Sequence, residues 1–166
     1  MARCRVVLVN GPFGAGKTTV AEYIAEVNPT YRVCDWDDVA INTSTNLEKP
    51  ERTKIRLKNL LVLLRQTIRS GYSVIIPNTI NEHDIINAIK IATENKGAGF
   101  THVVLDIDET TCMTRLSSRK NKGSITDAST ANAIKKLKQF HSSENTIRLN
   151  SSDSTEEVYR KLSKYL

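Results

Sequence analysis

Hydrophobic residues along the chain gather in five short runs, which alternate with longer polar segments of helical spacing. The runs cover residues 4–10, 31–34, 72–76, 100–106 and 146–149, and each predicts a β-strand. We expect Pro77 to break the third strand, because proline cannot donate a ladder hydrogen bond. Strands that alternate with helices predict an α/β fold with a parallel sheet, whose ligands bind at the carboxyl ends of the strands.

The segments between the strands place apolar residues three and four positions apart, as amphipathic helices do. Val20, Ile24 and Val27 are expected to share the apolar face of the first helix. Asn81 is expected to cap the third helix, and Ser154 with Glu157 forms a capping box for the last. The predicted helices cover residues 19–27, 51–70, 82–95, 109–119, 126–140 and 155–165.

A phosphate-binding pattern, G-x-x-x-x-G-K-[ST], occupies residues 11–18 between the first predicted strand and helix. Backbone N–H groups of such a loop, with the N-terminus of the next helix, form a concave anion site. Lys17 would bring its charge to the β- and γ-phosphates, and the Thr18 hydroxyl would bind the Mg²⁺ that bridges them. The pattern by itself indicates no role for two of these residues, Pro12 and Phe13. Nucleotide binding is expected at Gly11, Pro12, Phe13, Gly14, Ala15, Gly16, Lys17, Thr18 and Thr19.

Length and composition indicate one globular domain spanning residues 1–166. Hydrophobic residues make up 39% and charged residues 25%, which excludes a disordered chain. No stretch is long and apolar enough for a membrane span or a signal peptide. Cys4, Cys34 and Cys112 are odd in number and far apart, which favours reduced thiols. We expect a cytoplasmic protein, monomeric by default.

The net charge of +6 is unevenly distributed. Residues 51–69 hold six basic side chains against one acidic, and residues 110–141 hold seven against one. These stretches are either solvated helix faces or a basic rim over an anionic substrate. Nucleic acid is a less favoured partner, because no aromatic residues that stack on bases are interleaved with the charges.

Two carboxylates, Asp35 and Asp37, directly follow the second predicted strand. At the carboxyl end of the sheet they can orient a substrate hydroxyl, accept its proton, or hold Mg²⁺ through water. The alternative is a purely local role, in which Asp37 or Asp38 caps the short turn that follows. Trp36 between them is expected in the core.

Two arginines, Arg115 and Arg119, lie four residues apart and therefore on one helical face. On a closing segment they would neutralise the charge of a transferring phosphoryl group. The alternative is that both are solvated residues of a surface helix.

The apolar residues that end in Leu105-Asp106 imitate a Walker B motif, but they lie on the fourth strand. The magnesium side of the phosphate-binding strand should face the third strand, which ends near Asn78 and Thr79 without a carboxylate. Either one of these two residues holds a metal-bound water, or the Asp35 and Asp37 pair does. The three histidines are scattered and suggest no catalytic dyad.

The chain resembles small P-loop kinases of the shikimate, gluconate and nucleotide kinase group, with particular likeness to tunicamycin-resistance (TmrB-like) ATP-binding proteins. The likeness rests on residues 10–18, on the Ile-Ile-Pro-Asn-Thr-Ile of residues 75–80, and on Arg115-Leu116-x-x-Arg119. It implies a P-loop NTPase fold, a three-layer α/β/α with a five-stranded parallel sheet in the order 2-3-1-4-5. It also implies a short lid around residues 115–126, and adenine between that lid and residues 150–153.

The activity that follows from the resemblance is transfer of the γ-phosphoryl group of ATP, with Mg²⁺, to a hydroxyl of a small molecule. That acceptor would be a nucleotide, a sugar acid or an antibiotic-like compound. One alternative is a polynucleotide 5′-hydroxyl kinase, and another is a non-catalytic ATP-binding resistance protein. The residues expected to be catalytic are Lys17, Asp35, Asp37, Arg115 and Arg119.

Overall fold

The computed structural model of the chain describes residues 3–40, 47–118, 127–140 and 146–166. Its strands form one parallel sheet in the order β2-β3-β1-β4-β5, which confirms the expected α/β class and strand order. The strands are β1 Arg5–Asn10, β2 Tyr31–Val33, β3 Ser73–Asn78, β4 Gly99–Asp106 and β5 Thr146–Asn150.

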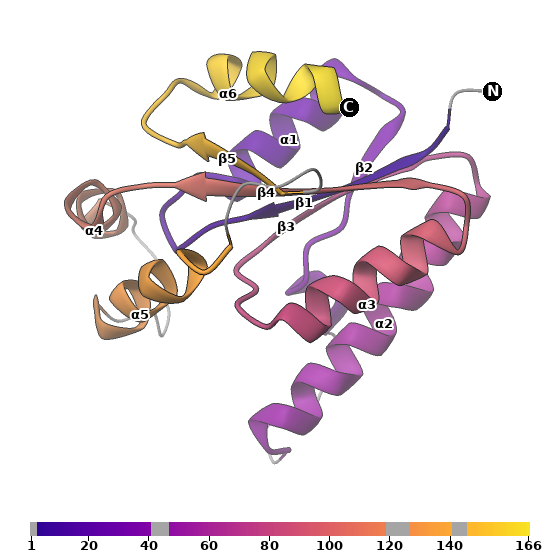
Figure 1. Ribbon diagram of the computed structural model, residues 1–166, viewed down its shortest axis with the longest axis horizontal. Coiled ribbons are helices and arrows are strands. Elements are labelled where there is room, and N and C mark those ends of the chain that lie inside the picture. Colours follow the sequence, from indigo (N-terminus) through magenta and orange to yellow (C-terminus); the bar gives the residue numbers. More distant parts are fainter. Residues whose placement is uncertain (1–2, 41–46, 119–126, 141–145) are drawn as a thin grey trace.

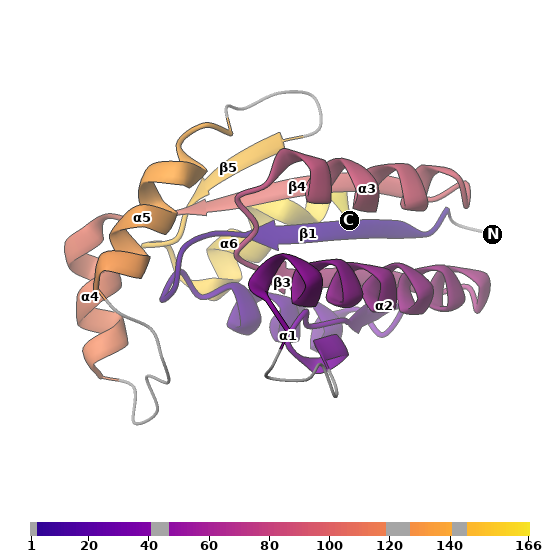
Figure 2. The same ribbon diagram turned by 90° about the horizontal axis from the view of Figure 1, so that it is seen from below.

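Helices cover both faces of the sheet, so the molecule has three layers (Figure 1). One face carries α1 (Lys17–Val27) and α6 (Thr155–Leu162), and the other carries α2 (Lys49–Arg69) and α3 (His83–Glu94). Beyond the carboxyl ends of the strands lie α4 (Glu109–Ser117) and α5 (Asp127–Leu137), as Figure 2 shows from below. Two 3₁₀ turns, η1 (Asp38–Ala40) and η2 (Ser163–Tyr165), complete the described elements. None of the described helices has the length and apolar character that a membrane crossing needs.

The two faces of β1 explain why its four central residues are all apolar. Val6 and Leu8 pack into the core under α2 and α3, whereas Val7 and Val9 pack into the core under α1 and α6. A parallel strand covered by helices on both sides has no solvent-facing side, so it shows no polar alternation. Asn10 ends the strand on the same side as Leu8, and it is fully buried.

Pro77 does not break the third strand, contrary to the sequence prediction. It lies inside β3, is buried, and pairs in register with Val9 of β1. On its other side β2 ends at Val33, opposite Ile75, and Cys34 N–H donates to the Ile75 carbonyl at 2.8 Å. Because β2 is so short, no carbonyl of a neighbouring strand lies opposite the Pro77 nitrogen on this side, and no ladder hydrogen bond is lost there.

Two helix predictions were also wrong in detail. Val27 is 44% exposed, because it is the last residue of α1 and the chain leaves the helix at Asn28. Asn81 does not cap α3, whose N-cap is Glu82 with no side-chain hydrogen bond. The carbonyl of Asn81 instead accepts a hydrogen bond from Gln139 Nε2, at 2.7 Å.

The last helix begins as expected, since the Ser154 hydroxyl accepts a hydrogen bond from Glu157 N–H at 3.2 Å. Its regular part ends at Leu162, and the remaining predicted turn is the 3₁₀ turn η2. The buried side of α6 consists of Val158 and Leu162, which pack against α1.

Candidate functional site

The loop between β1 and α1 is shaped by glycines with positive φ. Gly14 has φ of 83°, and a Cβ there would lie 3.1 Å from the carbonyl oxygen of Cys112 in α4. Gly16, the N-cap residue of α1, has φ of 81°, and a Cβ there would project into open space. That open space at a helix N-terminus is what a bound phosphate requires. The loop residues therefore fit a nucleotide phosphate chain.

Lys17 is the first residue of α1 and is held against the loop that precedes it. Its Nζ donates to the Pro12 carbonyl at 2.8 Å and lies 5.8 Å from the centre of the Phe13 ring. The Phe13 carbonyl in turn accepts a hydrogen bond from the Cys112 thiol of α4. Pro12 and Phe13, for which the sequence indicated no role, thus position the lysine and the loop.

A cavity of about 190 Å³ lies on one side of the loop, toward β2 and β3. It brings the lysine and the threonine hydroxyl of the loop together with both candidate carboxylates, which lie further along the sequence. The residues that line it are Phe13, Gly14, Gly16, Lys17, Thr18, Asp35, Asp37, Pro77, Asn78 and Thr79.

The two carboxylates of this cavity differ in environment. Asp35 is partly buried, and its Oδ1 accepts the Asp37 N–H at 2.9 Å. Burial, reinforced by the neighbouring carboxylates of Asp37 and Asp38, raises the pKa of Asp35 despite that hydrogen bond and the charge of Lys17. The Asp37 side chain is 86% exposed, with Arg56 Nη1 3.7 Å from its Oδ1. The carboxylate that stabilises this turn is therefore Asp35, whereas the capping alternative had named Asp37 or Asp38.

The end of β3 supplies polar groups without a carboxylate, as expected. Asn78 Oδ1 accepts the Thr79 N–H at 2.6 Å, and the Thr79 hydroxyl donates to the Gly11 carbonyl at 2.8 Å. Within the described residues, no three His, Cys, Asp or Glu side chains form a metal-binding group. Magnesium needs few protein ligands beside nucleotide phosphates, so Thr18 with water-mediated contacts from Asp35 or Asp37 fits that ion.

Asp106, the imitation of a Walker B carboxylate, lies on the far side of β1 from β3. It forms an ion pair with Arg148 of β5, whose Nε lies 2.8 Å from Asp106 Oδ2. The same guanidinium donates to the carbonyls of Leu137 and Phe140 at the end of α5. Asp106 is thus a structural partner of Arg148, in agreement with the sequence interpretation.

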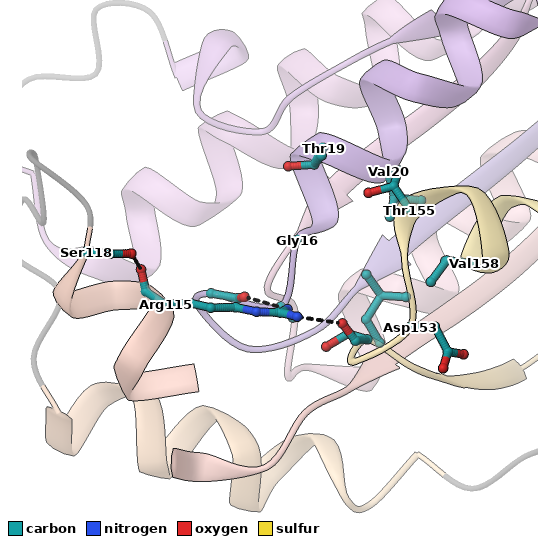
Figure 3. A pocket seen from close by; sticks show the side chains of 12 residues that line it. Gly16, Thr19, Val20, Arg115, Ser118, Asp153, Thr155 and Val158 are labelled. Carbon is teal, nitrogen blue, oxygen red and sulfur yellow. Dashed lines mark hydrogen bonds between the residues drawn. The ribbon is translucent and has the colours of Figure 1, made fainter. Parts of the chain in front are cut away.

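A second cavity, of about 340 Å³, lies on the other side of the loop, between α4 and the segment that joins β5 to α6 (Figure 3). Arg115 reaches across it from α4, and its Nη2 donates to the Ser151 carbonyl at 3.0 Å. The Ser151 hydroxyl is buried and has no hydrogen-bond partner among the residues that the structure describes. The lining residues are Gly14, Ala15, Gly16, Thr19, Val20, Leu105, Arg115, Ser118, Ser151, Asp153, Thr155 and Val158.

The structure therefore brings Lys17, Thr18, Asp35 and Asp37 together in one cavity and places Arg115 in the other. Arg119 and most of the expected lid, residues 119–126, lie outside the described residues. The lining residues that sequence reasoning did not assign to the site are Val20, Leu105, Thr155 and Val158. They are ordinary residues of a strand and of two helices, so no sequence signal distinguishes them.

His102 of β4 is a histidine buried in the core. Its side chain is 2% exposed and hydrogen-bonds with Asn10 and Thr146. Burial, with smaller contributions from the charges of Arg148 and His83, lowers its pKa from 6.5 to about 4.

We expect this histidine to make the stability of the protein depend on pH. Between pH 6.5 and about 4 the unfolded chain binds a proton at His102 that the folded chain does not, so the free energy of unfolding falls as the pH falls. The contribution reaches about 3 kcal/mol at the acid end. Urea unfolding at several pH values should show this slope in the wild type and lose it in His102→Gln. The matched control His83→Gln, at an exposed histidine, should keep it, and equal slopes in all three proteins would contradict the assignment.

Comparison with family models identifies the family of the chain, and comparison with solved structures identifies its fold. Residues 6–143 match the AAA_33 family, an AAA domain. No curated protein matches the sequence.

Three solved structures resemble the chain. The tunicamycin resistance protein of Deinococcus radiodurans has a TM-score of 0.74 and 18% identity, over 98% of this chain and 95% of that one. A sugar kinase from Janibacter sp. HTCC2649 has a TM-score of 0.73 and 19% identity, over 96% and 93%. A gluconokinase from Sinorhizobium meliloti 1021 has a TM-score of 0.71 and 16% identity, over 97% and 90%. At these identities the structural likeness shows a shared fold.

Proposed function

The chain belongs to the AAA_33 family of P-loop kinases, and from that membership we propose that it transfers the γ-phosphoryl group of ATP to a hydroxyl group of a small molecule. The acceptor would be a nucleotide, a sugar acid or an antibiotic-like compound. The kinases among its structural neighbours support the reaction class.

One observation supports the proposal most: the two cavities meet at the phosphate-binding loop. Gly14 and Gly16 line both of them, so a triphosphate in the loop would have one cavity on each side. The larger cavity has the apolar and hydroxyl groups that suit a nucleoside, and the smaller has carboxylates that suit an alcohol. A donor and an acceptor on opposite sides of one phosphate is the arrangement that phosphoryl transfer needs.

The loop would hold the triphosphate with its backbone N–H groups and Lys17, and Thr18 would bind Mg²⁺. Bound Mg²⁺ would neutralise charge on the β- and γ-phosphates. Asp35 faces the acceptor cavity and would accept the hydroxyl proton as the acceptor oxygen bonds to the γ-phosphorus and the bond to ADP breaks. Asp37 is the second candidate for this role. Arg115, beside the loop carbonyl of Gly14, would offset charge on the nucleotide side, and Arg119 stays a prediction.

A mass-spectrometric screen tests this function directly. The protein is incubated with ATP, Mg²⁺ and separate panels of nucleosides and nucleotides, sugar acids and hydroxylated antibiotics. We expect one class to gain a single phosphoryl group, and Lys17→Ala to give far less of that product than the wild type. Tight ATP binding without phosphorylation of any compound would favour the non-catalytic resistance protein instead.

A polynucleotide 5′-hydroxyl kinase is kept as a second candidate because of the outer face of α2. Lys54, Lys58, Arg65 and Arg69 are all exposed and are spaced by four, seven and four residues, so they share one helical face. This face is about 22 Å long and has the charge that a phosphate backbone requires. Labelled ATP and an oligonucleotide with a free 5′-hydroxyl test it, and binding that does not weaken as salt is raised would exclude it.

A further inference from the structure

The side chain of Asn10, at the end of β1, is fully buried and uses all its hydrogen-bonding capacity. Its Oδ1 accepts from Gly11 N–H at 2.9 Å and from Ile80 N–H at 3.0 Å. Its Nδ2 donates to the Ile80 carbonyl at 2.7 Å and contacts His102 Nε2 at 3.1 Å. Because two backbone N–H groups face Oδ1, the amide has one acceptable orientation.

These contacts join the phosphate-binding loop to the wall of the smaller cavity. The backbone ladder between β1 and β3 ends at the pair Asn10 and Asn78. Beyond it, the Asn10 amide pairs with both backbone groups of Ile80, as a further ladder residue would. The Thr79 hydroxyl adds its bond to the Gly11 carbonyl, so both backbone groups of Gly11 are held. The first loop residue and the segment after β3 are thus fixed to each other.

The orientation of the Asn10 amide also determines the state of His102. Since Nδ2 of Asn10 is a donor, His102 Nε2 must accept, and the ring proton lies on Nδ1, 3.3 Å from the Thr146 hydroxyl. A proton on Nε2 would leave this contact with two hydrogen-bond donors and no acceptor. His102 therefore holds the Asn10 amide only while it is neutral, and its lowered pKa agrees with this state. Leu8 of β1 and His102 of β4 are in register, so Asn10 and His102 are diagonal neighbours on one face of the sheet.

We propose that Asn10 and His102 are positioning residues, which lock the phosphate-binding loop to the 78–80 segment so that the donor and acceptor sides of the site keep one separation. The proposal rests on the proposed function, because it concerns the two sides of that site. Neither side chain lines the two cavities, so both act through Gly11 and Ile80. Transfer depends steeply on the separation of the reacting atoms, so a loosened link should lower turnover more than it lowers nucleotide affinity.

The test uses amide hydrogen exchange with a non-hydrolysable ATP analogue and Mg²⁺ as the probe. In the wild type the analogue should slow exchange at Gly11 and Ile80 together. In His102→Leu and Asn10→Ala it should protect Gly11 but lose most of its effect at Ile80. The rescue variant His102→Gln, whose side-chain oxygen can accept from Asn10, should restore joint protection. Exchange at Val103 of β4 and urea unfolding report whether each variant is folded.

A kinetic readout separates positioning from a merely structural role. With Mg²⁺ and ATP, and with the acceptor found by the screen or water in its place, we expect kcat to fall about tenfold in His102→Leu while KM for ATP stays within about twofold. His102→Gln should recover most of kcat. Unchanged Ile80 protection in both the Leu and the Ala variants, or equal effects of Leu and Gln at His102, would overturn the proposal. If no compound is phosphorylated, the proposed function fails, and the exchange data still decide whether the two segments are locked together.

Discussion

Replacing Lys17 by alanine should lower ATP turnover by about 10² to 10³ fold, the largest loss we expect from a single substitution in the loop. The lysine is the first residue of α1, and its ammonium already lies beside the loop at the Pro12 carbonyl. Without it, the charge that develops on the β- and γ-phosphates during transfer would lose the side-chain cation that the loop brings to it. Turnover measured by coupled ADP release, and affinity measured by titration with a fluorescent ATP analogue, should both fall.

The matched control for this variant is Lys96→Ala. Lys96 is exposed and lies between α3 and β4, at the amino end of the sheet, away from the loop. It changes the net charge equally, so a purely electrostatic effect at long range would lower turnover in both variants. Lys17→Ala with wild-type turnover would contradict the proposed function altogether. Circular dichroism and urea unfolding verify that neither variant is unfolded.

Most of the fold was predictable because its signals are local. Strand-like apolar runs and helical spacing each depend on a few neighbouring residues, and the order 2-3-1-4-5 followed from the resemblance. Pro77 shows where local reasoning fails. Whether proline is tolerated in β3 depends on the length of β2, which ends at Val33, 44 residues before Pro77. Because β2 ends opposite Ile75, no residue of β2 needs a hydrogen bond from position 77.

The candidate site was predictable where a motif supplies it and not where distant segments meet. Residues 11–18 form a contiguous pattern, so the loop was found directly. Thr155 and Val158 line the second cavity only because the chain after β5 returns beside the loop. The Asn10 and His102 contact spans 92 positions and depends on the register of β1 with β4, which the sequence does not display. Such contacts follow from tertiary structure alone.

Replacing Asp35 by asparagine should lower phosphoryl transfer by about 10² to 10⁴ fold and leave nucleotide affinity nearly unchanged. Asparagine has the same shape, and its side-chain oxygen can still accept the Asp37 N–H, so the turn is retained. What is lost is the ability to accept the proton of the acceptor hydroxyl. The measurement is the rate of product formation with the acceptor found by mass spectrometry, together with analogue affinity.

The pH dependence of transfer sharpens this prediction. Burial raises the pKa of Asp35 above its ordinary 3.8, and the group acts as a base only when ionised. The wild-type rate should therefore fall as the pH falls through that raised pKa, and Asp35→Asn should lack this fall.

Two neighbouring carboxylates serve as controls for Asp35. Asp37→Asn removes an exposed charge beside Arg56, and Asp38→Asn removes one at the start of η1, so both should affect transfer less. A large loss in Asp37→Asn with a normal rate in Asp35→Asn would move the proton-accepting role to Asp37. Equal, small losses in all three would show that none of these carboxylates acts as the base, and would contradict the role proposed for Asp35. The comparison thus identifies the side chain that accepts the proton, because the three substitutions remove the same charge within four residues of one another.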